Sequence, residues 1–113
     1  MVEQMDTKQA LDSVILEMRR GVIILAVLSQ LGHEEYGYSL IKRLADCGMD
    51  IDQGTLYPLL RRLESQGWLQ SDWRVEDGRP RRYYSLSPEG RSLLPALKDE
   101  WRSLARTLAR MVE

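Results

Sequence analysis

Hydrophobic residues recur at helical spacing along most of this chain, and the clearest repeat lies between residues 52 and 68. Positions i, i+3, i+4 and i+7 share one face of an α-helix, so a helix here would bury a stripe formed by Leu56, Leu59, Leu60 and Leu63. Asp52 is a suitable N-cap for this helix, and Gly67 is a suitable stop. Pro58 lies more than a turn beyond Asp52, where a missing N–H disfavours a helix. Either the helix begins later than Asp52, or it tolerates Pro58 in its early turns.

Two further helices are predicted before this one. The first shows apolar residues at alternating steps of three and four, at Leu11, Ile15, Met18, Val22 and Leu25. The capping-box pair Asp6 and Gln9 would open it, and Gly32 would end it. Beyond Gly21 it is apolar on nearly all sides, so we expect its second half in the core. Residues 36–47 predict a short second helix, whose inner stripe holds Leu40, Ile41 and Leu44.

The segment after the third helix predicts a β-hairpin. Two alternating runs, WLQSDWRV and RRYYSL, flank the dipeptide Asp77-Gly78, which is a strong hairpin signal. The intervening EDGRP is longer than a two-residue loop. Arg79, Arg81 and Arg82 would then lie at or beside the hairpin tip. A basic tip is also a device that keeps an exposed sheet edge soluble, so its functional meaning depends on the helix before it.

A last helix begins with Ser87 as N-cap, Pro88 at the first helical position and Glu89 in the first turn. Its apolar residues follow the a/d seam of a coiled coil, at Leu94, Leu97, Trp101, Leu104, Leu108 and Met111. One alternative packs this seam on the first helix of the same chain. We favour a two-fold dimer in which the seam and Leu11 meet a second copy, because one small domain cannot easily bury all these apolar stripes.

The predicted fold is mainly α with a small β-hairpin, an α+β winged helix-turn-helix with N- and C-terminal dimerisation helices. Residues 1–113 would form a single domain, with the winged helix-turn-helix in 8–87 and the C-terminal dimerisation helix in 88–113. A length of 113 residues, 43% of them hydrophobic and 29% charged, suits one globular domain. No apolar run reaches the roughly 18 residues of a membrane helix, and the N-terminus lacks a secretory signal. The single Cys47 cannot form an internal disulfide, which favours the cytoplasm.

Charge and chemistry narrow the function class. The net charge is −1, but residues 1–52 carry five bases against nine acids, and residues 53–113 carry eleven bases against eight acids. A near-neutral chain with a local arginine cluster is compatible with a DNA-binding protein and also with an ordinary solvated surface. Nucleotide-binding and nucleophile motifs are absent from the sequence, and His33 and Cys47 alone cannot make a zinc site. We therefore expect no enzyme activity, no metal and no cofactor.

A winged helix-turn-helix would place the helix over residues 53–66 in the major groove of DNA. Arg61 is the best candidate for a base contact, because its fork matches O6 and N7 of guanine. The hydroxyls of the helix would reach phosphates, and Arg62 would meet a phosphate or an acid. The hairpin arginines would lie along the DNA backbone or in the minor groove, and the glycines permit close approach. These further DNA-binding candidates are Gly54, Thr55, Tyr57 and Arg62 in the helix and Gly78, Arg79, Arg81 and Arg82 in the hairpin. The alternative is a winged-helix module for protein contact that does not bind DNA.

Three runs of the chain resemble the PadR-type transcriptional regulators: YGYSLIKRL, GTLYPLLRRLESQGWL and DGRPRRYYSLSPEG. The resemblance covers roughly residues 16–113. It implies a dimeric winged-helix regulator of bacteria or archaea, usually a repressor, in the small subgroup with a single C-terminal dimerisation helix. It also implies DNA contacts by Tyr38, Ser39, Thr55, Tyr57, Arg61 and Arg79. A two-fold dimer would bind double-stranded DNA at a palindromic operator, with half-sites about 34–36 Å or a multiple apart.

The position of Trp101 on the seam suggests an effector site. Two-fold symmetry would bring two indoles face to face, and a planar aromatic or cationic small molecule would stack between them and release the DNA. We expect Ile15, Met18, Asp99 and Glu100 near this ligand. The alternative is that Trp101 only fills the core of the dimer.

Overall fold

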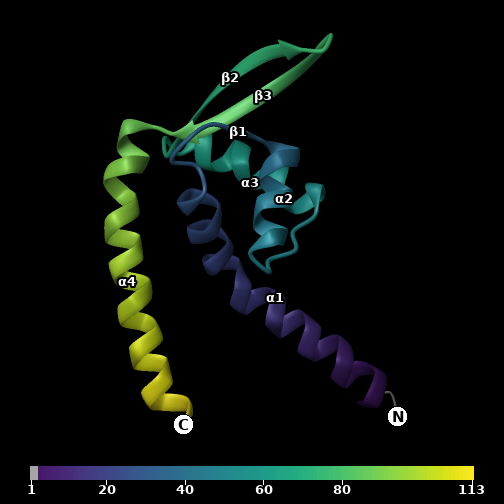
Figure 1. The fold of residues 1–113 in the computed structure, drawn as a ribbon. Helices are drawn as coiled ribbons and strands as arrows, with labels where there is room; N and C mark the ends of the chain where they lie inside the picture. Colours follow the sequence, from purple (N-terminus) through teal and green to yellow (C-terminus); the bar gives the residue numbers. More distant parts are fainter. Residues whose placement is uncertain (1–2) are drawn as a thin grey trace.

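The computed structural model describes residues 3–113, with side chains from residue 7 onward. Its elements in chain order are α1 (Glu3–Ser29), β1 (Glu35–Tyr36), α2 (Gly37–Asp46), α3 (Gln53–Ser65), β2 (Leu69–Glu76), β3 (Arg79–Leu86) and α4 (Pro88–Val112). Figure 1 shows α2 and α3 beneath the hairpin of β2 and β3, with α1 and α4 extending away from this body. The predicted α+β winged helix-turn-helix is confirmed. Helix α1 already contains Glu3, so the predicted start at Asp6 is wrong, and the Asp6 side chain lies outside the described residues.

The core forms where α1, α2, α3 and the sheet meet. The predicted leucine stripe of α3 is buried, and the end of α1 contributes Val27 and Leu28, with Leu31 just after the helix. Burying a leucine side chain contributes roughly 1.5–3 kcal/mol, so this cluster holds α3 firmly against the body. The backbone N–H of Leu86 donates to the carbonyl of Leu31 at 2.9 Å, which ties the end of β3 to the end of α1.

Helix α3 begins directly after Asp52. The Asp52 carboxylate accepts a hydrogen bond from the backbone N–H of Thr55 at 2.8 Å, as an N-cap does. Pro58 therefore lies within the helix, beyond its first turn. Without an N–H, Pro58 leaves the Gly54 carbonyl without its usual partner four residues on. Both residues are exposed, so water can satisfy that carbonyl, and of the two alternatives for Pro58 the second is correct.

The sheet has three antiparallel strands in the order β1-β3-β2. The two-residue strand β1 was not predicted, since it occupies the segment where the second helix was expected to begin. At the hairpin tip, Asp77 has φ +52° and Gly78 has φ +76°, which is typical of a two-residue primed turn. The register pairs Glu76 with Arg79. The expectation of a longer loop is therefore wrong, and Arg81 and Arg82 lie within β3 rather than at the tip.

The start of α4 is locked to the turn before β2. The Ser87 hydroxyl accepts from the Gly90 N–H at 3.0 Å and donates to the Gly67 carbonyl at 2.6 Å. A Cβ on Gly90 would lie 2.1 Å from the Trp68 carbonyl oxygen, so only glycine fits this close approach. The predicted N-cap Ser87 and first-turn Pro88 are confirmed.

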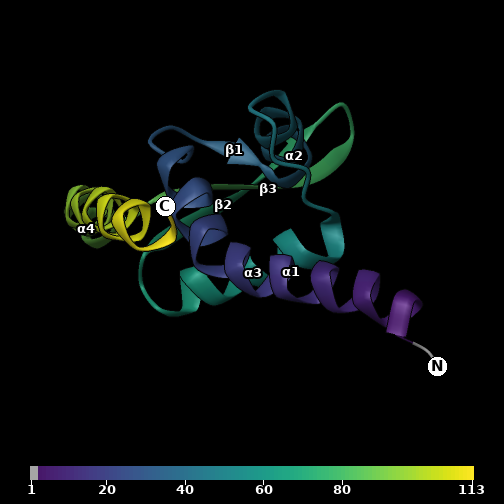
Figure 2. The same cartoon turned by 90° about the horizontal axis from the view of Figure 1, so that it is seen from below.

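The distal halves of α1 and α4 leave the body in different directions (Figures 1 and 2). Leu94 and Leu97 pack partly against the core. Beyond them, much of the seam and of distal α1 is exposed, with exposed fractions of 47% at Trp101, 54% at Leu108 and 57% at Leu11. Helix α1 of the same chain therefore does not cover the distal seam.

Candidate nucleic-acid interface

Helix α3 presents a polar face opposite its buried leucines. Gly54, Pro58, Arg61 and Ser65 are all exposed, whereas Tyr57, which helical spacing also predicts on this face, is half-buried. Arg61 and the flanking Arg62 have no acidic partner among the described residues. Because buried leucines hold the helix and Arg61 has no acidic partner in the part of the chain that the structure describes, α3 can offer that guanidinium to a ligand.

The two flanks of α3 differ. On one flank, Thr55 and Arg62 border a shallow pocket of about 410 Å³ against Ile23 and Ile24 of α1. On the other flank, the half-buried ring of Tyr57 packs against α2. A Cβ at Gly37 would lie 2.3 Å from Cε1 of Tyr57, so this ring rests directly on the α2 backbone. Sequence reasoning missed Gly37, whose only signal is a glycine between two tyrosines at the start of a helix.

Helix α2 carries two of the predicted DNA contacts, of which Tyr38 is exposed and Ser39 is hydrogen-bonded within the protein. Tyr38 is 53% exposed, and the Lys42 ammonium lies 5.7 Å from the centroid of its ring. Ser39 donates to Glu35 Oε1 at 2.7 Å, while Arg43 bonds the other oxygen of Glu35 at 3.1 Å. The Glu35 side chain is 11% exposed. This carboxylate thus joins β1 to α2, and it holds the Ser39 hydroxyl inside the protein.

We call the β2–β3 hairpin the wing. Its outer face carries a row in which cationic and aromatic side chains alternate. Arg74 bonds both oxygens of Glu34, at 2.5 and 2.6 Å, and covers the Tyr83 ring at 4.7 Å. This hydrogen bond to Glu34 raises the pKa of Arg74. Tyr83 meets Tyr36 edge-on at 5.5 Å, and Arg81 lies 4.5 Å from the Tyr36 ring centroid.

Glu76 closes this row near the turn. Its carboxylate accepts from the Tyr83 hydroxyl and lies 3.5 Å from the Arg81 guanidinium. The hydrogen bond to Glu76 raises the pKa of Tyr83. Arg74 and Arg81 therefore stiffen the sheet, and each already has an acidic partner.

The inner face of the wing is fastened to α3 by Arg82. Its guanidinium donates to Glu64 at 2.8 Å and to the Ser71 hydroxyl at 3.0 Å, and Ser71 in turn donates to Glu64 at 2.6 Å. Arg82 also faces the rings of Trp73 at 5.7 Å and Tyr84 at 5.4 Å. Arg79 differs, because it is exposed beside the turn and has no acidic partner in the described part of the chain.

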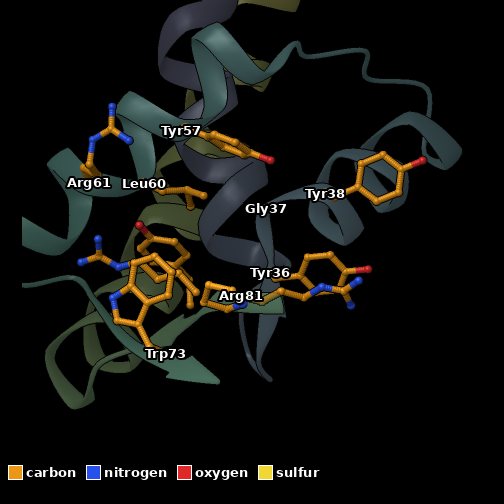
Figure 3. A pocket seen from close by; sticks show the side chains of 11 residues that line it. Tyr36, Gly37, Tyr38, Tyr57, Leu60, Arg61, Trp73 and Arg81 are labelled. Atoms are coloured by element: carbon orange, nitrogen blue, oxygen red, sulfur yellow. The ribbon is translucent and has the colours of Figure 1, made fainter. Parts of the chain in front are cut away.

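Between α2, α3 and the wing lies a half-open pocket of about 430 Å³, which we call the wing groove. Figure 3 shows Tyr57, Leu60 and Arg61 on one side of it and Trp73 on the other. Trp73 is 66% exposed and did not appear among the sequence candidates. The full lining is Tyr36, Gly37, Tyr38, Tyr57, Leu60, Arg61, Trp73, Pro80, Arg81, Arg82 and Tyr84.

Other kinds of site find no support in residues 3–113. Among the described side chains, no cluster of His, Cys, Asp or Glu could hold a metal ion. Within the same part of the chain, no helix is both long and apolar enough to cross a bilayer.

Three helices followed by a hairpin, with a basic outer face on the third helix, define a winged-helix DNA-binding protein. Residues 24–96 match the model of the Transcriptional regulator PadR-like family. Transcriptional regulator Rv3488 of Mycobacterium tuberculosis (strain ATCC 25618 / H37Rv) is 40% identical over 91 residues, which cover 80% of this chain and 85% of that protein.

Solved structures agree with this match. The crystal structure of a PadR family transcriptional regulator from Eggerthella lenta DSM 2243 is 43% identical, with a TM-score of 0.86 over 96% of this chain and 97% of that one. A PadR-like transcriptional regulator from Bacillus cereus strain ATCC 14579 is 26% identical, with a TM-score of 0.75 over 86% of this chain and 97% of that one. The chain belongs to the PadR-like family of transcriptional regulators, so it is a DNA-binding regulator and not an enzyme.

Proposed function

We propose that this protein is a dimeric repressor that reads a palindromic operator with α3 and the wing. The observation that carries the proposal is the exposed face of α3, where Arg61 has no acidic partner among the described residues and leucines buried beneath it fix the helix. Arg61 contacts a guanine edge, and Gly54 lets the helix approach the DNA. This function requires the protein to be in the cytoplasm, where the DNA is located.

The remaining candidates divide by their contacts. Tyr38, Thr55 and Arg62 contact phosphates, and Arg79 beside Gly78 contacts the backbone or the minor groove. Tyr57, Ser39, Arg81 and Arg82 hold the helices and the wing in position, because each already packs or bonds inside the protein. Arg62 lacks an acidic partner in the described structure, which favours the phosphate of its two predicted roles.

Dimerisation rests on the exposed apolar surface of distal α1 and α4. A monomer rarely exposes so many large apolar side chains on two helices to water, and a seam with coiled-coil spacing suits a second helix. The interface residues we propose are Leu11, Leu94, Leu97, Trp101, Leu104, Leu108 and Met111. Two-fold symmetry then places two α3 helices at the spacing of two half-sites.

An effector site at the dimer seam is the finer part of the proposal. Trp101 is 47% exposed and Met18 is 69% exposed in the single chain, so both are available to a ligand between two subunits. Ile15 lies partly buried on α1, and Asp99 and Glu100 are exposed beside Trp101. Asp99 lies 3.3 Å from Arg102, in an exposed pair that is weak enough to exchange.

DNA binding is tested by fluorescence anisotropy with duplexes from the protein's own upstream region, at several salt concentrations. We expect affinity to fall steeply with salt, as phosphate contacts require, and Arg61→Ala to weaken binding. If no duplex binds even at low salt, the protein-contact module becomes the better function. Transcription from the bound promoter, with and without protein, distinguishes repression from activation.

The effector is tested by titrating tryptophan fluorescence with planar aromatic and cationic compounds. We expect quenching in the wild type that is lost in Trp101→Ala, while Trp68 and Trp73 supply the residual signal. Quenching by none of the compounds, or equal quenching in the variant, would leave Trp101 with a packing role only.

A further inference from the structure

The wing carries an exposed apolar strip that the DNA-contact candidates do not include. Trp73 is 66% exposed and Val75 is 74% exposed. The register pairs Trp73 with Arg82 and Val75 with Pro80, so these four side chains share one face of the hairpin. Further along the same face, Tyr84 and other residues enter the core. The strip is therefore the outward continuation of a core-facing surface, and it has no cover of its own.

This strip faces α3 across the wing groove. Trp73 and Pro80 line the groove from the wing. Figure 3 shows Trp73 across the groove from Tyr57 and Arg61 of α3. The indole is also held in place, because Arg82 lies against it and is bonded to Glu64 of α3. An exposed tryptophan that the protein fixes at the mouth of a groove is suited to contact a ligand.

We propose that the wing groove seats one sugar–phosphate strand of the operator, with the Trp73 indole against a deoxyribose or base edge. This inference rests on the proposed function. The groove is continuous with the exposed face of α3, where Arg61 lines it and has no acidic partner among the described residues, while the register directs Arg79 to the opposite face of the hairpin from Trp73. A strand that places a phosphate at Arg61 and the neighbouring apolar sugar at Trp73 matches this pairing of charge and ring. Trp73 is thus a contact residue, and Arg82 is its positioning residue.

The lining of the groove includes no acidic residue, and the two carboxylates near it are paired, which favours a polyanionic occupant. Glu64 is bonded to Arg82, and Glu76 is bonded to Tyr83 and Arg81, so neither carboxylate faces the groove unpaired. Apolar side chains of DNA-binding proteins commonly contact sugars and base steps where a wing or arm meets the duplex. A protein partner in the groove would have to occupy the face of the molecule on which α3 is exposed.

The test measures DNA affinity by anisotropy for the wild type, Trp73→Ala and Trp73→Phe. A lost stacking contact weakens binding by about tenfold or more, so we expect that loss in Trp73→Ala and partial recovery in Trp73→Phe. Because no cation is removed, the dependence of affinity on salt keeps the wild-type slope. Gln70→Ala is the matched control, since Gln70 lies on the same strand but on the opposite face and is exposed.

A second measurement guards against a folding defect. Replacing Trp68 and Trp101 by Phe leaves Trp73 as the only tryptophan, and operator DNA should change its emission. Equal affinity of Trp73→Ala and wild type, or no emission change on DNA binding, overturns the inference while leaving DNA recognition by α3 intact. If the wild type itself binds no duplex, both the inference and the proposed function fail.

Discussion

Arg82 and Arg79 of the wing differ in their contacts, so we expect Arg82 to stabilise the fold and Arg79 to contact DNA. Arg82 bonds Glu64 and Ser71, and the Arg82 and Glu64 side chains are 34% and 27% exposed. Arg79 is exposed and lacks an acidic partner in the described structure. We predict that Arg82→Ala lowers the free energy of unfolding, whereas Arg79→Ala leaves it nearly unchanged and alters DNA binding instead.

The magnitude follows from the contacts of Arg82. Hydrogen bonds to charged groups contribute about 1.5–3 kcal/mol when buried, and exposed ion pairs about 0.2–1 kcal/mol. Exposure of about one third places the loss between these limits, and the lost contacts with the Trp73 and Tyr84 rings add roughly 0.5–1 kcal/mol. We therefore expect a total loss of about 2 kcal/mol for Arg82→Ala and less than about 0.5 kcal/mol for Arg79→Ala.

Urea unfolding followed by circular dichroism measures these changes, with all variants at one protein concentration because a dimer's stability depends on it. Anisotropy at several salt concentrations supplies the second measurement. Each lost phosphate contact reduces the slope of log affinity against log salt by about 0.9, which we expect for Arg79→Ala and not for Arg82→Ala. An Arg82→Ala variant that flattens this slope at unchanged stability would instead make Arg82 a direct phosphate contact.

Three further substitutions test other contacts. Gly37→Ala would place a Cβ 2.3 Å from the Tyr57 ring, so we expect a loss of about 1–3 kcal/mol by urea unfolding and weaker DNA binding; Gly21→Ala, with open space around it, is the stabilising control. Ser87→Ala removes an N-cap and the donor to a carbonyl, and a loss of about 2–3 kcal/mol is expected; a loss no greater than that of the exposed Ser92→Ala would contradict this account. Leu108→Glu should convert the dimer to monomer in sedimentation velocity, whereas Ala109→Glu should not; a dimeric Leu108→Glu would exclude the proposed seam.

The sequence alone determined the features that depend on neighbours along one helix. The leucine stripe of α3, the Asp52 and Ser87 caps and the outward position of Arg61 follow from helical spacing and from orphan N–H groups at helix ends. These interactions reach three or four residues along the chain, so their partners can be read directly from the order of residues.

Tertiary structure alone decided which arginines are free. Glu34 and Arg74 are 40 residues apart, and Glu64 and Arg82 are 18 apart, so no local rule pairs them. The hairpin register, set by the two-residue turn, directs Arg82 toward α3 and leaves Arg79 beside the tip. A shift of one residue would have reversed these faces, because side chains alternate along a strand. Where a charged side chain finds its partner thus depends on strand pairing, which the chain acquires only on folding.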